Sequence, residues 1–180
     1  MIHLIILILL FAAELIYFRI ANRYNIFDKP NSRSSHTEVT IRGGGIIYWF
    51  AAVLYTVFHF SPNTLWFLGG ITLISTISLW DDIKLLSQKT RFFFQMLAMT
   101  LIFYFTNVFN LFSLPLIILS YVFFVGVINA YNFMDGINGI TGLYSIAVLL
   151  SLLYVNVFIT TFVNNDLIIF PIIASLVFLF

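Results

Sequence analysis

Two neighbouring aspartates, Asp81 and Asp82, directly follow Trp80 at the end of an apolar run. Adjacent carboxylates repel each other, and a cation beside them relieves that repulsion. Mg²⁺ is the natural candidate, because it binds carboxylate oxygens and substrate phosphates together. The alternative is a solvated helix end, since aspartate is mostly an exposed residue. The position beside a long apolar segment favours a functional role for the pair.

A second polar segment repeats at every third position, with Asn129, Asn132, Asp135 and Asn138. On an α-helix three successive members of such a series fall within about 120° of arc and form one polar stripe. Glycines at 136, 139 and 142 would let backbone approach a ligand or open the helix. The alternative is a polar seam that binds helices together. A carboxylate within the stripe favours a functional site.

A third polar segment carries Arg33 and His36, and then Arg42 before a run of three glycines. Arginine and glycine-rich backbone suit phosphate, through paired donors and exposed N–H groups. The alternative is that the basic residues only set membrane topology and that the glycines form a flexible entry to the next element.

The composition places these residues in a membrane protein. The chain is 62% hydrophobic and only 8% charged, against about 25% charged in soluble domains, so its apolar surface must meet lipid. A net charge of +1 gives no support to a nucleic-acid partner. The absence of cysteine excludes disulfides, a thiolate nucleophile and a cysteine metal site.

The apolar residues fall into seven runs: Ile2–Phe18, Gly45–Phe60, Leu65–Trp80, Phe92–Thr106, Leu111–Ile128, Leu143–Val163 and Leu167–Phe180. A membrane helix needs about 20 residues, and lipid favours helices because they pair every backbone group internally. The sequence therefore predicts an all-α, polytopic transmembrane bundle over residues 1–180, one integral-membrane domain with six full helices. The last run ends at Phe180, which predicts a truncated seventh helix and the N-terminal part of a longer fold.

The basic residues predict the orientation. All eight lie in two connections, Arg19–Gly44 and Asp81–Arg91, and the alternate connections carry none. Positive loops stay in the cytoplasm, so these connections and Asn129–Gly142 are predicted to be cytoplasmic and the N-terminus outside. Glu14, His3 and His59 are predicted to be structural, with Glu14 reaching the membrane surface or pairing with Arg19.

Taken together, the motifs resemble a known family. They read Asp-x-Pro-x-x-Arg-x-x-His, Arg-Gly-Gly-Gly, Trp-Asp-Asp-x-Lys and Asn-x-x-Asn-Phe-Met-Asp-Gly-Ile-Asn-Gly, in this order. The chain thereby resembles the polyprenyl-phosphate N-acetylhexosamine-1-phosphate transferases of the glycosyltransferase 4 family. The resemblance implies transfer of a sugar-1-phosphate from a UDP-N-acetylhexosamine to undecaprenyl phosphate, with release of UMP. It also implies Mg²⁺, with Mn²⁺ as an alternative, and a cytoplasmic active face in the bacterial inner membrane, where a lipid-linked surface polysaccharide begins. A homodimer stays open.

The resemblance also assigns residues. The catalytic and metal-binding positions are Asp81, Asp82 and Asp135. The substrate-binding positions are Arg33, His36, Arg42, Lys84, Asn132 and Asn138. Many members carry a second aspartate where this chain has Asn138, and longer members add a Gly-Asp-x-Gly motif and a histidine-rich motif that these 180 residues lack. Two alternatives therefore remain: a catalytically inactive fragment or one half of a split enzyme, and, in another class, an ion-coupled transporter.

Overall fold

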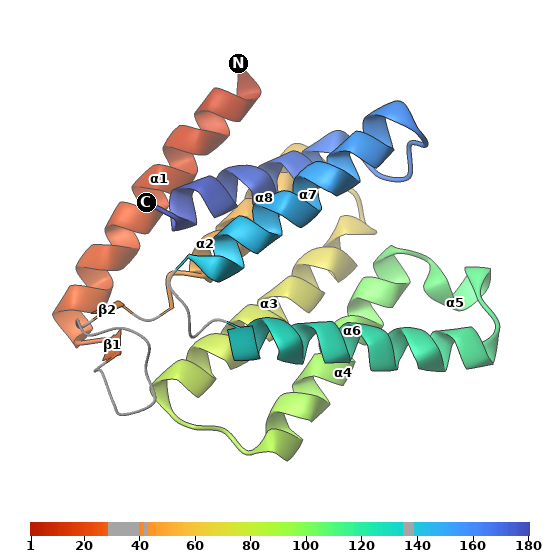
Figure 1. Cartoon of the computed structure of the whole chain (residues 1–180), viewed down its shortest axis with the longest axis horizontal. Helices are drawn as coiled ribbons and strands as arrows, with labels where there is room; N and C mark the ends of the chain where they lie inside the picture. The colour runs from red at the N-terminus through yellow and green to blue at the C-terminus, as the bar shows by residue number, and fades with distance from the viewer. Residues whose placement is uncertain (29–39, 42, 135–138) are drawn as a thin grey trace. The chain divides into compact units, whose positions relative to one another are not determined.

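The computed structural model describes residues 1–28, 40–41, 43–134 and 139–180, and it is helical throughout most of this length (Figure 1). Each predicted apolar run forms one helix. Their bounds are α1 Ile2–Tyr24, α2 Ile46–Phe58, α3 Thr64–Ile83, α4 Gln88–Phe105, α6 Leu114–Met134, α7 Ile140–Phe158 and α8 Asn165–Phe178. A one-turn helix, α5 (Val108–Leu111), stands between α4 and α6. The all-α prediction is therefore confirmed.

Four of the described helices, α1, α3, α6 and α7, are long and apolar enough to cross a membrane. The prediction was six full spans. The helices α2 and α8 have 13 and 14 residues and are shorter than the roughly 17 residues that a crossing needs. With several long apolar helices, the chain is a multi-pass membrane protein.

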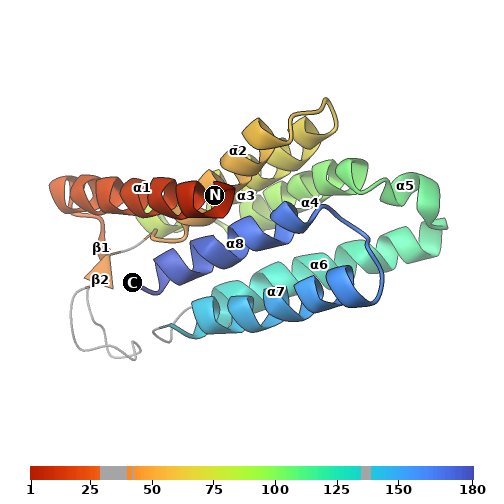
Figure 2. The same ribbon diagram turned by 90° about the horizontal axis from the view of Figure 1, so that it is seen from above.

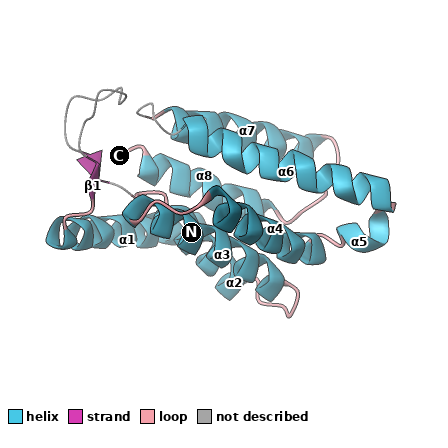
Figure 3. Ribbon diagram, turned by 90° about the horizontal axis from the view of Figure 1, so that it is seen from below, coloured by secondary structure: helices cyan, strands magenta, loops and turns pink. Residues whose placement is uncertain are grey.

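The first helix extends six residues beyond the predicted run, so that Arg19 and Arg23 lie on α1 and not in a loop. It ends at Asn25, whose backbone is left-handed with φ 53°. Two short strands follow, β1 (Phe27–Asp28) and β2 (Thr40–Ile41), which pair antiparallel. Figure 3 draws the strand region in magenta beside the end of α1.

The chain forms two compact units, of which unit 1 comprises residues 1–55 and 134–180. Within it, α8 packs against both α7 and α1 (Figures 1 and 2). Phe170 and Ala174 of α8 are fully buried, and Tyr48 of α2 donates a hydrogen bond to Ser175 Oγ at 3.0 Å. Gly142 of α7 faces Leu179, where a Cβ atom would come within 2.7 Å of a leucine methyl. Gly142 thus serves helix packing.

Unit 2 comprises residues Thr56–Phe133. Its helices α3 and α4 form a hairpin, and at Gly70 a Cβ atom would lie 2.9 Å from the Ala98 carbonyl oxygen. A small residue at this contact lets the two backbones approach closely, as in many membrane helix pairs. On the other side of α4, Phe103 packs with Val125 of α6.

The structure corrects the prediction for Glu14. Its side chain is 2% exposed, its Oε2 atom has no hydrogen-bond partner among the described residues, and Gly44 lies against its other oxygen. Glu14 therefore does not reach out to the membrane surface, because it is enclosed by unit 1. His3 has the predicted structural role, since its ring contacts Asp166 at 2.9 Å.

Candidate functional site

The aspartate pair lies in the last turn of α3, a helix of membrane-spanning length. The predicted run ended at Trp80, but the helix continues to Ile83, and the Lys84 N–H donates to the Trp80 carbonyl at 2.7 Å to close it. Both carboxylates are thus carried by helix and not by the loop. A helix terminus fixes their backbone and leaves the side chains to reach water.

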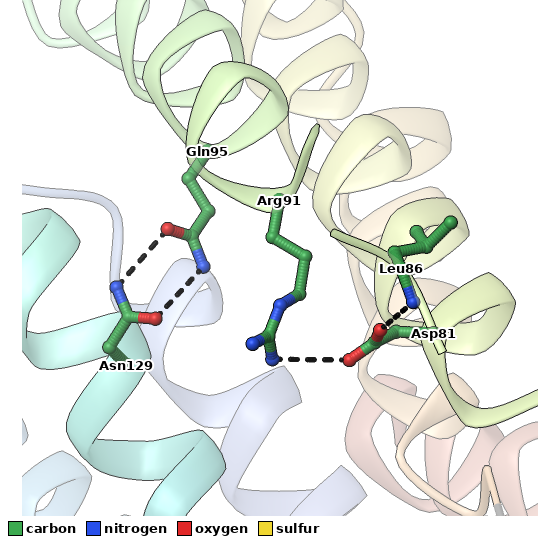
Figure 4. Close-up of polar contacts among 5 residues, drawn as sticks. All are labelled: Asp81, Leu86, Arg91, Gln95 and Asn129. Atoms are coloured by element: carbon green, nitrogen blue, oxygen red, sulfur yellow. Dashed lines mark hydrogen bonds and ion pairs between the residues drawn. The ribbon is translucent and has the colours of Figure 1, made fainter. Parts of the chain in front are cut away.

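Asp81 organises the connection between α3 and α4 (Figure 4). Its Oδ1 accepts the Leu86 N–H at 2.7 Å, and its Oδ2 accepts a hydrogen bond from Arg91 Nη1 at 3.2 Å. The two charged side chains are 19% and 29% exposed. Both oxygens of Asp81 are therefore engaged, one by backbone and one by an arginine.

Asp82 differs from its neighbour in exposure. Successive helix residues point about 100° apart, so the two carboxylates leave α3 in different directions. Asp82 is exposed, as is Lys84, whereas Asp81 is half-buried. The pair thus offers one carboxylate held in a network and one that faces solvent.

The polar stripe of the sequence divides between two structural roles. Asn129 of α6 donates through Nδ2 to Gln95 Oε1 of α4 at 3.2 Å and to the Val125 carbonyl at 2.8 Å (Figure 4). The packing alternative is therefore realised at Asn129. Asn132, one turn further along α6, is exposed and could meet a ligand. Gly139, with φ 76°, caps the start of α7.

Several predicted positions lie outside the described residues: Arg33, His36, Arg42, Asp135 and Asn138. Of the remaining site residues, the structure gathers Asp81, Asp82 and Lys84 at one end of α3 and places Asn132 near the end of α6. Among the described residues no three acidic or histidine side chains form a metal-binding group. The three-aspartate centre, which includes Asp135, stays a prediction.

Two residues of this region were missed by sequence reasoning. In the sequence Arg91 served only as evidence for membrane topology. Its ion pair with Asp81 joins residues ten positions apart, and no sequence pattern predicts it. Gln95 was overlooked inside an apolar run, although a polar residue within a membrane segment is itself a signal. Gln95 is 8% exposed, whereas its amide partner Asn129 lies at the exposed surface of α6.

Comparison with known proteins bears on the same part of the chain. Residues 64–180, well over half of the sequence, match the family described as Glycosyl transferase family 4. The match contains the aspartate pair and the asparagine-rich segment, and it begins after the first connection with Arg33, His36 and Arg42. No curated protein and no solved structure matches the chain.

Proposed function

Because the chain belongs to glycosyl transferase family 4, and is in kind a membrane glycosyl-phosphate transferase, we propose that its donor is a UDP-N-acetylhexosamine. The acceptor is undecaprenyl phosphate, and the products are UMP and a lipid-linked sugar that starts a surface polysaccharide. The resemblance of the motifs from Trp80 to Gly139 to the N-acetylhexosamine enzymes supports these substrates.

One observation carries the proposal: a helix of membrane-spanning length ends in two carboxylates, and the next helix opens with Lys89 and Arg91. A lipid-borne phosphate can reach only the mouth of such helices, where a water-borne nucleotide can also arrive. Anionic substrates need cations there, and an acidic pair supplies a seat for a divalent one.

In the proposed reaction, an oxygen of the lipid phosphate attacks the phosphorus that bears the sugar. A new P–O bond forms to the lipid phosphate, the bond from that phosphorus to the UMP oxygen breaks, and UMP leaves with the electron pair. Two anions must meet, so the barrier is mainly electrostatic. Lys84, together with Lys89 and Arg91 at the start of α4, lowers the repulsion between them.

The donor set fits Mg²⁺, because this ion takes one or two carboxylates and completes its shell with water and substrate phosphates. Asp82 and Asp135 would hold it. Asp81 is the third predicted carboxylate, and its oxygens already accept bonds from Leu86 and Arg91. When bound, Mg²⁺ neutralises the diphosphate and stabilises the leaving UMP. Asn132 and Asn138 contribute amide contacts to the nucleotide sugar, and Arg33, His36 and Arg42 contact phosphate.

The proposed location is the cytoplasmic face of the bacterial inner membrane. All eight basic residues lie between positions 19 and 42 or between positions 84 and 91, and this clustering supports the orientation through the positive-inside rule. Single cysteines introduced at positions 82 and 132 and labelled from one side test it: both should react from the cytoplasm. Labelling from opposite sides would contradict a shared site.

The activity test uses membranes that contain this chain, undecaprenyl phosphate and a series of radiolabelled UDP-N-acetylhexosamines. We expect labelled lipid and UMP in equal amounts, dependent on Mg²⁺ or Mn²⁺, and neither from Asp82→Asn membranes. Absence of both products from wild-type membranes at every sugar would contradict the proposal and favour an inactive fragment or half of a split enzyme.

A further inference from the structure

Aromatic side chains gather at the open end of the α3–α4 hairpin, where α4 leads into α5 (Figure 1). The Trp66 ring of α3 stacks on the Tyr104 ring of α4, with centroids 5.4 Å apart and planes inclined by 29°. Phe109 of α5 contacts the Tyr104 ring at a centroid distance of 4.9 Å. Trp66 and Tyr104 are 47% and 53% exposed. Unit 2 thus carries a half-exposed aromatic cluster of Trp66, Tyr104 and Phe109.

The polar atoms of the two stacked rings are available to a partner outside the chain. Neither the Trp66 indole N–H nor the Tyr104 hydroxyl hydrogen-bonds another residue that the structure describes. The backbone beside them is already paired, since Asn63 Nδ2 donates to the Phe105 carbonyl at 3.0 Å. Such rings are enriched where one end meets an apolar medium and the other meets water. The aromatic cluster therefore presents two donors to an external acceptor.

The chain around the aromatic cluster is uncharged. Residues 60–80 and 92–134 contain no aspartate, glutamate, lysine or arginine. A suitable partner must offer hydrogen-bond acceptors next to hydrocarbon and needs no charge opposite its own. The glycerol-ester layer of a phospholipid bilayer has this chemistry, and tryptophan and tyrosine are enriched in that layer.

The length of α3 is consistent with such a partner. Its 20 residues span about 30 Å at 1.5 Å per residue, which matches the hydrocarbon thickness of a bilayer. Trp66 is the third residue of this helix, and Asp81 is the third from its end. A helix of this length that brings the carboxylate to one surface of the membrane brings Trp66 to the other.

We propose that the aromatic cluster anchors unit 2 in the membrane interface opposite the aspartate pair, where the Trp66 N–H and the Tyr104 hydroxyl donate to phospholipid ester carbonyls. This contact with lipid goes beyond the transferase reaction and does not depend on it. Because Trp66 and Asp81 belong to one helix, the anchor also sets the depth at which Asp81 and Asp82 lie at the opposite surface.

Quenching of tryptophan fluorescence by brominated lipids tests the position of the aromatic cluster. The chain has three tryptophans, so Trp49→Phe combined with Trp80→Phe leaves Trp66 as the reporter. The full chain is placed in phosphatidylcholine vesicles brominated either near the headgroup or near the end of the acyl chain. We expect the shallow bromines to quench Trp66 more than the deep ones. The reference is Phe123→Trp in a chain without other tryptophans, at an exposed position in the middle of α6, where the order should reverse.

Two conservative variants test the hydrogen bonds. Trp66→Phe and Tyr104→Phe remove one donor each and keep an aromatic ring. Each should lower the Tm in ester-linked phosphatidylcholine by about 2–4 °C, the shift expected for one hydrogen bond in a chain of this size. In ether-linked lipid, which lacks the carbonyls, neither should change the Tm. Tyr121→Phe is the control, because its hydroxyl bonds Thr100 within the protein at 2.7 Å and its loss should be equal in both lipids.

Three results would overturn the proposal. Stronger quenching of Trp66 by the deep bromines would place the ring in the hydrocarbon. Absence of quenching by either lipid would mean that water or a protein surface, such as a second copy of this chain, covers the cluster. Equal losses of Tm in ester-linked and ether-linked lipid would exclude the ester carbonyls as acceptors. If the chain with Trp66 alone does not fold, the difference in quenching between wild type and Trp66→Phe gives the same comparison.

Discussion

The connections α3–α4 and α7–α8 solve one structural problem with different chemistry. In each, a side chain from the end of the first helix accepts backbone N–H groups of the connection. Asp81 does this for Leu86. Asn156 does it for Phe162 and Val163 at 2.8 and 3.0 Å, and its amide also donates to the Val163 carbonyl and to Asn165.

The difference lies in charge and burial. Asn156 is 1% exposed, and both ends of its neutral amide are hydrogen-bonded. Asp81 is ionisable, half-buried and paired with Arg91. A neutral amide thus suffices to fix a hairpin connection in this chain, and the carboxylate at position 81 exceeds what the turn requires. This additional charge lies in the connection where the sequence predicts a cytoplasmic active site, so we assign it a functional role.

The largest effect should come from Asp82. Asp82→Asn removes a proposed metal ligand, and such charge stabilisation of a transition state amounts to several kcal/mol, so transfer should fall by about 10³-fold. The measurement is UMP release at equal amounts of folded protein. Asp166→Asn is the matched control on the α7–α8 side and should keep wild-type rates. Comparable losses in both variants would remove the distinction between the two connections.

The next effect concerns stability. Asn156→Asp replaces two donors with a carboxylate oxygen that faces the Val163 carbonyl in a buried place. Leaving a buried charge without compensation should lower the free energy of unfolding by about 3 kcal/mol, read from denaturant titration in detergent micelles. Asn164→Asp is the control, since Asn164 only accepts a bond at the α8 N-terminus and aspartate caps equally well. Unchanged stability of Asn156→Asp would show that the amide is dispensable.

Helix packing in the two hairpins gives a smaller contrast. A Cβ atom at Gly70 would meet the Ala98 carbonyl, whereas one at Gly142 would meet the flexible end of Leu179. Overpacking costs about 1–3 kcal/mol. Gly70→Ala should lower the free energy of unfolding more than Gly142→Ala does, because a backbone carbonyl can move less than the end of a side chain. Gly126→Ala, with nothing within 4 Å, is the neutral reference. The reverse order in unfolding titrations would contradict the packing of α3 on α4.

The smallest stability effect is expected for Asp81→Asn. An asparagine oxygen can still accept the Leu86 N–H, and a partly exposed ion pair contributes at most about 1 kcal/mol. The free energy of unfolding should therefore change by less than about 1 kcal/mol, in contrast to Asn156→Asp. A large loss of stability would mean that the Asp81 carboxylate stabilises the fold, and it would contradict the functional role inferred from its charge.

The helices were predictable because lipid imposes long apolar runs, and all seven runs became helices. Their ends were less predictable. Polar residues such as Asn22 and Arg23 suggested a loop, but α1 continues through them, since helical geometry does not stop where apolar side chains do. The apolar run to Val163 includes a turn that the pattern did not predict. The helix α7 ends at Phe158, and the Asn156 side chain accepts a hydrogen bond from the backbone of the turn. No apolar pattern encodes the one-turn α5 or the two-residue strands.

The candidate site was predicted in residue types and less well in partnerships. Asp81 and Asp82 were predicted as one pair, but they leave the helix in different directions, and Asp81 contacts Leu86 and Arg91. Those contacts depend on the path of the α3–α4 connection, and no residue spacing encodes that path. The same limit applies to Gln95 and Asn129, which meet across two helices.

Unit 1 is assembled from two stretches of chain, with all of unit 2 encoded between them. At about 5–20 residues per second, the ribosome needs roughly ten seconds to produce the intervening segment. For that time α1 resides in the bilayer without α8, the later helix of unit 1 that packs against it. Unit 1 can therefore be completed only after unit 2 has been synthesised, because the packing of α1 against α8 joins the two ends of the chain.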